Sequence, residues 1–168
     1  ALPIFFTLSG YFIARSVLRP PSFSGSRFIK NRSRRILPSY LIALFLVVAL
    51  VDASAMIAAP PGSALLDFGL HLTLLHGWFG QYSLSIMGPY WTLSHEWCFY
   101  LLMLLGAPLL RSRRWWLLPV AMIVAAFLSR CGQYYSWWHL PKGIEHKFPI
   151  SLWDQFAFGI LAARLVDL

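Results

Sequence analysis

YWTLSHEWCFYLLMLLGAPLL, residues 90–110, is the stretch that decides the class of fold. It is apolar over about 20 residues, the length of a helix that crosses a bilayer. Near its start it nevertheless carries His95 and Glu96 side by side. Counted from Pro89, Glu96 lies about 10 Å along such a helix, inside the apolar zone. Ionisable groups at that depth mark either a functional passage or a polar cluster that fixes helix packing, and both interpretations stay open.

The composition points to the same class. The chain has 168 residues, of which 58% are hydrophobic and only 12% charged, whereas charged residues make up about 25% of a typical soluble domain. The net charge of +8 comes from Arg clusters between apolar runs, a pattern typical of topology signals and anionic partners rather than nucleic-acid binding. The two cysteines suggest neither a disulfide framework nor a metal site.

We therefore predict an all-α, polytopic transmembrane bundle with about five spans, forming a single domain over residues 1–168. The expected spans are Ala1–Leu18, Ile36–Ala59, Pro89–Leu110, Trp115–Leu128 and Ile150–Val166. Pro38 would fall in the first turn of the second span, where a missing N–H does little harm.

Two segments between the spans have a different character. Leu65–Phe79 is apolar with interspersed polar residues, and we expect a short helix lying at the membrane interface. His71 and His76 within it are five residues apart, so a helical metal-binding pair is disfavoured and an interfacial position is expected. The stretch from Arg130 to Pro149 is polar and aromatic, and we expect a loop.

The cations alternate along the chain. Seven lie between Arg15 and Arg35, and none lies between Pro60 and Gly88. Arg111, Arg113 and Arg114 then follow the third span. By the positive-inside rule, the Arg15–Arg35 loop is cytoplasmic and the third span starts on the outer side.

The segment FIKNRSRRILPSY, residues 28–40, concentrates these cations before the helix expected from Ile36. Guanidinium groups bind phosphates bidentately, and a helix N-terminus adds backbone donors. The cluster would suit a phosphorylated donor. It would equally suit orientation of the protein in the membrane and binding of anionic lipid headgroups. The charge of the cluster does not distinguish these roles from donor binding.

Other polar positions are less specific. Ser9 and Gly10 in FFTLSG are small and allow close helix contact, and no G-x-S-x-G elbow supports Ser9 as a nucleophile. Thr92, Glu96 and Tyr100 share one helix face at their spacing. Asp154 can cap the fifth span or interact with its dipole.

Taken in order, these motifs resemble the acyltransferase 3 family of bacterial integral-membrane acyltransferases, which includes O-acetylases of polysaccharides and O-antigens. The resemblance runs from about residue 4 to residue 165. The matching elements are FFTLSG (Phe5–Gly10), an RxxR followed by IxPxY (Arg32, Arg35, Ile36, Pro38, Tyr40), WTLxxExxFY (Trp91–Tyr100) and DxFxxGxxxA (Asp154–Ala163).

The resemblance implies a fragment. Family members have about ten spans of bilayer length, so this chain would correspond to spans two to six. The first span carries an Arg and a His thought to serve at the catalytic centre, and a piece without it should be inactive by itself. The position of His95 is commonly apolar in the family, so no role follows for it.

The implied activity is transfer of an acyl group, expected to be acetyl, from acyl-CoA as co-substrate to a hydroxyl of a carbohydrate or related acceptor. Arg32, Arg35, Lys30 and Arg34 would clamp the donor phosphates, and Glu96 would orient the acceptor or a catalytic partner. Trp91, Tyr100 and Asp154 would line the acceptor cavity. The implied location is the bacterial inner membrane, with lipid as a partner and neither a bound cofactor, a metal nor nucleic acid.

Two rivals stay open at this point. A transporter or flippase for a glycan or lipid-linked precursor would also place ionisable groups at membrane depth. A non-catalytic lipid-binding scaffold would use the arginines only for headgroups. The acyltransferase hypothesis depends on one structural expectation, namely that Arg32, Arg35 and Glu96 border the same wet passage.

Overall fold

The computed structural model describes residues 2–50, 63–79, 82, 86, 90–135 and 149–166. Within these ranges every regular element is a helix and there is no strand, which confirms the all-α prediction. The elements are α1 (Leu2–Leu18), α2 (Gly25–Leu50), α4 (Ser63–Leu72), η1 (His76–Trp78), α5 (Trp91–Leu110), α6 (Leu117–Tyr134), η5 (Pro149–Leu152) and α7 (Trp153–Val166).

Three of the described helices, α2, α5 and α6, are long and apolar enough to cross a membrane. The first and last expected spans are helical but shorter, with 17 residues in α1 and 14 in α7. A bilayer core needs about 20 residues of α-helix. The structure therefore supports a membrane protein, with two of the five expected spans below full length.

The start of the second span was predicted wrongly. α2 begins at Gly25, not at Ile36, so the arginine cluster lies within the helix and not at its N-terminus. Ser24 explains the early start, because its Oγ accepts a hydrogen bond from the backbone N–H of Arg27 (3.4 Å) as an N-cap does. Pro38 consequently lies inside the helix, where its ring removes the donor that the carbonyl of Arg34 would use.

Other predicted boundaries also differ from those in the structure. α6 continues to Tyr134, so Arg130 and the residues just after it are helical and the expected loop begins later. The turn of α7 that was expected from Ile150 is a 3-10 helix. The expected interfacial helix is split into α4 and η1. Ala1, residues 51–59, Pro89 and residues 136–148, which also figured in the predictions, lie outside the described residues.

The tightest contact in the bundle is the crossing of α1 and α7 at two glycines. A Cβ on Gly10 would lie 2.4 Å from the carbonyl oxygen of Phe156, and one on Gly159 would lie within 2.5 Å of α1 backbone atoms. Small residues let helix backbones approach this closely. The prediction that Gly10 permits close helix contact is thus confirmed. Beside the crossing, Phe156 stacks on Phe99 of α5, with ring centroids 4.1 Å apart.

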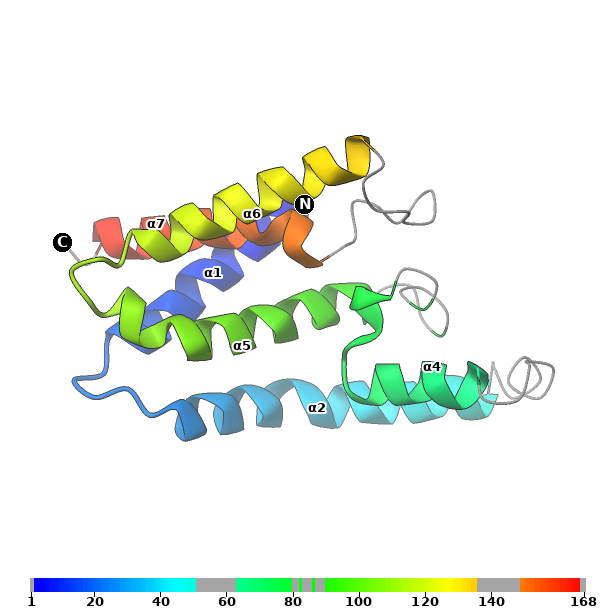
Figure 1. The fold of residues 1–168 in the computed structure, drawn as a ribbon. Coiled ribbons are helices and arrows are strands. Elements are labelled where there is room, and N and C mark those ends of the chain that lie inside the picture. Colours follow the sequence, from blue (N-terminus) through cyan, green and yellow to red (C-terminus); the bar gives the residue numbers. More distant parts are fainter. Residues whose placement is uncertain are drawn as a thin grey trace.

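Figure 1 shows α5 lying between α2 on one side and α6 with α7 on the other, and α1 crossing behind α5. The C-terminal ends of α1, α5 and α7 lie at the same end of the bundle as the N-terminal ends of α2 and α6. Arg15, Arg27, Arg111 and Arg164 belong to this end, whereas Arg130 belongs to the opposite one. Among the described residues, these four arginines therefore gather at one end of the bundle.

Candidate functional site

A cavity of about 300 Å³ opens between α1, α2 and α5, and we call it the glutamate pocket. Three helices contribute to its lining, which includes Ser9, Phe12, Arg32, Arg35, Glu96 and Tyr100. The RxxR element, the FFTLSG element and the WTLxxExxFY element thus meet in one place. The two arginines and Glu96 therefore line the same cavity.

Glu96 is held in this pocket by two hydroxyl donors. Tyr100 Oη donates to Glu96 Oε1 at 2.7 Å, and Ser9 Oγ donates to the same oxygen at 3.2 Å. The first bond follows from the i,i+4 spacing on α5, and the second joins α5 to α1. A carboxylate that accepts two hydrogen bonds in a partly buried site has a fixed orientation.

Arg32 is positioned by aromatic rings. Its guanidinium carbon lies 5.5 Å from the centroid of the Tyr100 ring and 5.7 Å from that of Phe28. Cations are attracted to ring faces at this range, so the rings hold the side chain without neutralising it. Tyr100 therefore contacts both the carboxylate and the guanidinium of the pocket.

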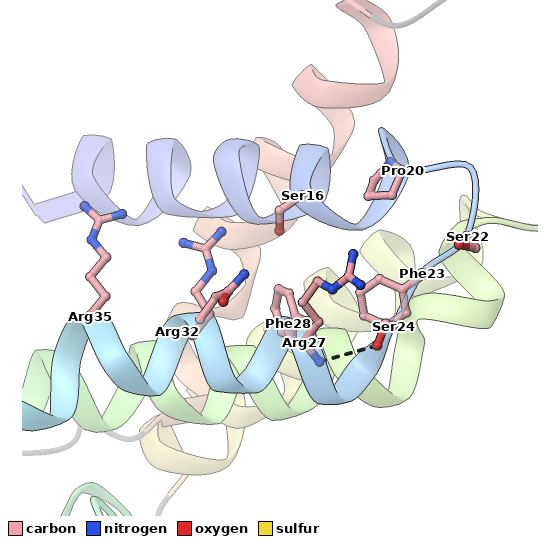
Figure 2. A pocket seen from close by; sticks show the side chains of 10 residues that line it. Ser16, Pro20, Ser22, Phe23, Ser24, Arg27, Phe28, Arg32 and Arg35 are labelled. Atoms are coloured by element: carbon pink, nitrogen blue, oxygen red, sulfur yellow. Dashed lines mark hydrogen bonds between the residues drawn. The ribbon is translucent and has the colours of Figure 1, made fainter.

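The spacing of the RxxR element explains why the side chains of Arg32 and Arg35 point the same way. Residues three apart on a helix lie on one face, and Figure 2 shows both side chains extending from α2 toward α1. Lys30 and Arg34 are exposed and line neither this pocket nor the second one described below. The expected four-cation clamp is thus divided by the structure into two inward and two outward residues.

A second cavity, which we call the arginine pocket, lies beside the first and has a volume of about 360 Å³. Its lining includes Pro20, Phe23, Arg27, Phe28, Arg32 and Arg35 (Figure 2). Arg32 and Arg35 belong to both linings, so they stand where the two cavities adjoin. Three guanidinium groups at one cavity make it suited to a ligand carrying several phosphates.

The structure places Trp91 and Asp154 away from the glutamate pocket. Trp91 packs edge-on against His95, with ring centroids 5.0 Å apart, and against Phe6. Asp154 forms an ion pair of 2.6 Å with Arg130 and is not among the residues that line the pocket. Of the three residues assigned to an acceptor cavity, only Tyr100 lines the pocket that contains Glu96.

His71 and His76 were expected at the interface, but both are fully buried. Their rings stack in parallel with centroids 4.0 Å apart, and the Oη of Tyr40 donates to the carbonyl of His71. Burial lowers the pKa of His76 to about 3, and the neighbouring His71 adds to this effect. Within the described residues, no three His, Cys, Asp or Glu side chains are arranged to hold a metal.

His95 is also fully buried and belongs to this interior and not to the pocket beside it. Its Nδ1 lies 2.6 Å from the carbonyl oxygen of Trp91, and its ring stacks on Phe6 of α1. Adjacent residues on a helix point in different directions, so Glu96 faces the cavity while His95 faces the core.

Sequence reasoning missed the role of two residues. Ser9 was interpreted as a packing residue, yet it bonds to Glu96. Phe28 was not singled out, yet it supports Arg32. The i,i+4 spacing of Phe28 and Arg32 was a usable signal, whereas the Ser9 contact joins residues 87 positions apart and has no local signal.

Comparison with known proteins gives a family. A family model described as "Acyltransferase domain" matches residues 1–168, the whole chain. The chain is also 32% identical over 176 aligned residues to "Putative membrane-bound transacylase BcsY" of Komagataeibacter xylinus. That alignment covers 96% of this chain but 43% of the relative, so the chain spans less than half the relative's length. No solved structure matches.

Proposed function

Because the chain belongs to the acyltransferase 3 family, we propose that it forms part of a membrane acyltransferase whose donor is acyl-CoA. The acyl group is acetyl, and the acceptor is a hydroxyl of a carbohydrate or related molecule. The protein works in the bacterial inner membrane with the cationic end of the bundle facing the cytoplasm, where acyl-CoA is found. The transacylase relative is named for the same class of chemistry.

One observation carries this proposal: Arg32 and Arg35 border both cavities. Acyl-CoA is a polyanion with a long neutral arm that ends in the thioester. The arginine pocket suits the phosphates, because guanidinium groups bind them bidentately. The arm then passes the two arginines and brings the thioester into the glutamate pocket, where Glu96 lies.

The reaction needs attack of the acceptor hydroxyl oxygen on the thioester carbonyl carbon. A C–O bond forms, the C–S bond breaks, the hydroxyl proton goes to a general base and the departing thiolate is protonated to coenzyme A. The family resemblance assigns the base to a histidine of a preceding span. Glu96, held by Ser9 and Tyr100, orients the acceptor hydroxyl or that histidine.

The donor site is tested in the full-length protein by comparing alanine variants of the arginines that line the cavities with a variant of an arginine that does not. We expect Arg35→Ala and Arg32→Ala each to weaken acyl-CoA binding about tenfold, because each removes a charge-assisted phosphate contact. Arg34→Ala is the matched control, since it removes the same charge next to Arg35 from an exposed position outside both cavities. Binding is measured by isothermal titration in nanodiscs of zwitterionic lipid.

Equal weakening by the inward and outward variants would mean that only the general positive potential matters. In that case the arginines serve lipid headgroups, and the acyl-CoA assignment is wrong. Repeating the titration with anionic lipid separates the two sources of phosphate, because headgroups that occupied the arginine pocket would compete with acyl-CoA.

The acceptor side is tested with Glu96→Gln, which keeps the shape of the side chain and removes its charge. We expect transfer to fall about 100-fold, within the range found for positioned acid–base groups, while acyl-CoA affinity is retained. Mass spectrometry of cell-surface glycans with and without the gene gives an independent readout. A transporter would change the amount of glycan exported, whereas the proposed enzyme changes its mass by an acyl group.

A further inference from the structure

Arg111, at the C-terminal end of α5, contacts the connection between α1 and α2. Its Nη1 donates to the carbonyl oxygens of Val17 and Pro20, both at 2.8 Å, and its Nη2 donates to that of Pro21 at 2.7 Å. One side chain thus bonds to three backbone carbonyls that lie 90 or more positions earlier in the chain. The planar fork of Arg suits it to such multiple bonding.

The sequence explains why the first of these carbonyls, that of Val17, needs an outside donor. In an α-helix the carbonyl of Val17 would accept from the N–H of residue 21, or from residue 20 in a tighter last turn. Both positions are proline, which has no N–H. Arg111 supplies the missing donor, and its charge also suits the C-terminal end of the α1 dipole.

The connection held in this way forms one wall of the arginine pocket. Pro20, Ser22, Phe23 and Ser24 all line that cavity, and Figure 2 shows them following the chain from α1 down to α2. Arg111 itself lies on the outer side of the same wall, where it borders a neighbouring hollow together with Ser22 and Phe23. The wall therefore has the donor cavity on one side and the Arg111 fork on the other.

We infer that Arg111 is a positioning residue for the donor site: it fixes residues 18–24 in the shape that closes the arginine pocket. This inference rests on the proposed function for the identity of the donor. Arg111 does not line the arginine pocket, so it acts through the wall and not through contact with the phosphates. Without it, the wall must be ordered each time the donor binds, which lowers affinity and leaves the chemical step unaltered.

The experiment uses three variants of the full-length protein: Arg111→Ala, Arg111→Lys and Arg113→Ala. Arg111→Lys keeps the charge but replaces the fork by a point donor, and it also serves if the alanine variant folds poorly. Arg113→Ala is the charge-matched control, because Arg113 is an exposed residue of the same cluster two positions away. The readouts are hydrogen exchange of the amides in residues 18–24 and the kinetic constants for acyl-CoA.

We expect both Arg111 variants to speed amide exchange in residues 18–24. We also expect them to raise KM for acyl-CoA about tenfold, because charge-assisted hydrogen bonds to the wall are lost. The value of kcat should stay within about twofold, and Arg113→Ala should change neither readout. Unaltered exchange in the Arg111 variants would overturn the inference. So would faster exchange with an unaltered KM, because the wall would then have no part in donor binding.

Failure of the proposed function gives a different result. If the donor is not acyl-CoA, Arg32→Ala leaves acyl-CoA affinity unaltered, while the exchange measurement still reports whether Arg111 holds the wall. Running Arg32→Ala in the same series therefore separates the two failures.

Discussion

The two faces of α1 form opposite kinds of contact within one helix. The face with Phe6, Gly10 and Ala14 is buried, and around Gly10 backbone touches backbone on α7 with no space for a single added carbon. The face with Phe5, Ser9 and Phe12 opens on the glutamate pocket and leaves a cavity between α1 and α2. A single helix thus joins a packed contact to an open one.

The difference between the faces teaches what each contact requires. Close backbone packing needs small residues and excludes charge, and on that side the sequence supplies glycine and alanine. An open cavity at membrane depth needs polar groups whose hydrogen bonds are satisfied nearby. On that side the sequence supplies Ser9, which bonds across the gap to Glu96. The packed face holds α1 in place so that the open face keeps its geometry.

The largest effect is expected at the packed face. In Gly159→Ala the added carbon would lie 2.1 Å from the carbonyl oxygen of Thr7, so backbone must move. We expect a loss of about 3 kcal/mol in the free energy of unfolding, as for severe overpacking, measured by denaturation in mild detergent. The control is Gly69→Ala, where nothing lies within 4 Å of the added carbon. Similar stability of the two variants would contradict the contrast between the faces.

The open face should respond in activity more than in stability. We expect Tyr100→Phe to lower transfer about tenfold and Ser9→Ala about threefold, because each removes one hydrogen bond to the Glu96 carboxylate. In a Glu96→Gln background, Ser9→Ala should add little, since residues that share a partner are not additive. Ser39→Ala, an exposed position on α2 outside both cavities, is the control. Full additivity in the double variant would refute the shared role.

A smaller, pH-dependent effect is expected at the buried histidines. His76 stays neutral in the fold because its pKa is lowered from 6.5 to about 3, while the unfolded chain takes up a proton below pH 6.5. Its contribution to stability is therefore complete above pH 6.5 and declines as the pH falls, by up to about 1.4 kcal/mol per pH unit. His71, whose ring stacks on that of His76, and His95 both help to lower the pKa of His76, and Asp67 is paired with His71.

This effect is measured as the free energy of unfolding between pH 7 and pH 5, in the wild type and in His76→Gln. The pH range spans the ordinary pKa of histidine. The wild type should lose more stability over this range than the variant. Parallel curves would show that His76 is not the group responsible.

The smallest effect is expected from the ion pair of Asp154 with Arg130. The Arg130 side chain is 48% exposed and the Asp154 side chain 19%, so screening limits the contribution to about 1 kcal/mol. Asp154→Asn should lower the thermal midpoint slightly and leave transfer unaltered, because the pair lies away from the glutamate pocket. A large loss of transfer would restore Asp154 to the acceptor site.

The fold was predictable from the sequence where a local pattern decides it. The length of the apolar segments predicted the all-α class and most of the helices, and Gly10 predicted a close contact between helices. The start of α2 was mistaken because a run of cations was interpreted as a loop, although Ser24 caps it and Arg and Lys are good helix formers. The effect of Pro38 was misjudged with it, since a long helix tolerates one lost backbone bond.

The arrangement of the candidate site was predictable only in part. The motifs led to Arg32, Arg35, Glu96 and Tyr100, all of which line one pocket. Helical periodicity fixes which residues share a face, but it does not fix which face meets which neighbour. For this reason Ser9 was missed and Asp154 was assigned to a cavity from which it is distant.

The glycine crossing also has a mechanical consequence. Since backbone meets backbone there, α1 cannot slide or tilt on α7 without breaking the contact. Any widening of the glutamate pocket must then involve α2 or α5, the other two helices that line it. Pro38 leaves α2 with one backbone bond fewer, and helices bend most readily at such a point.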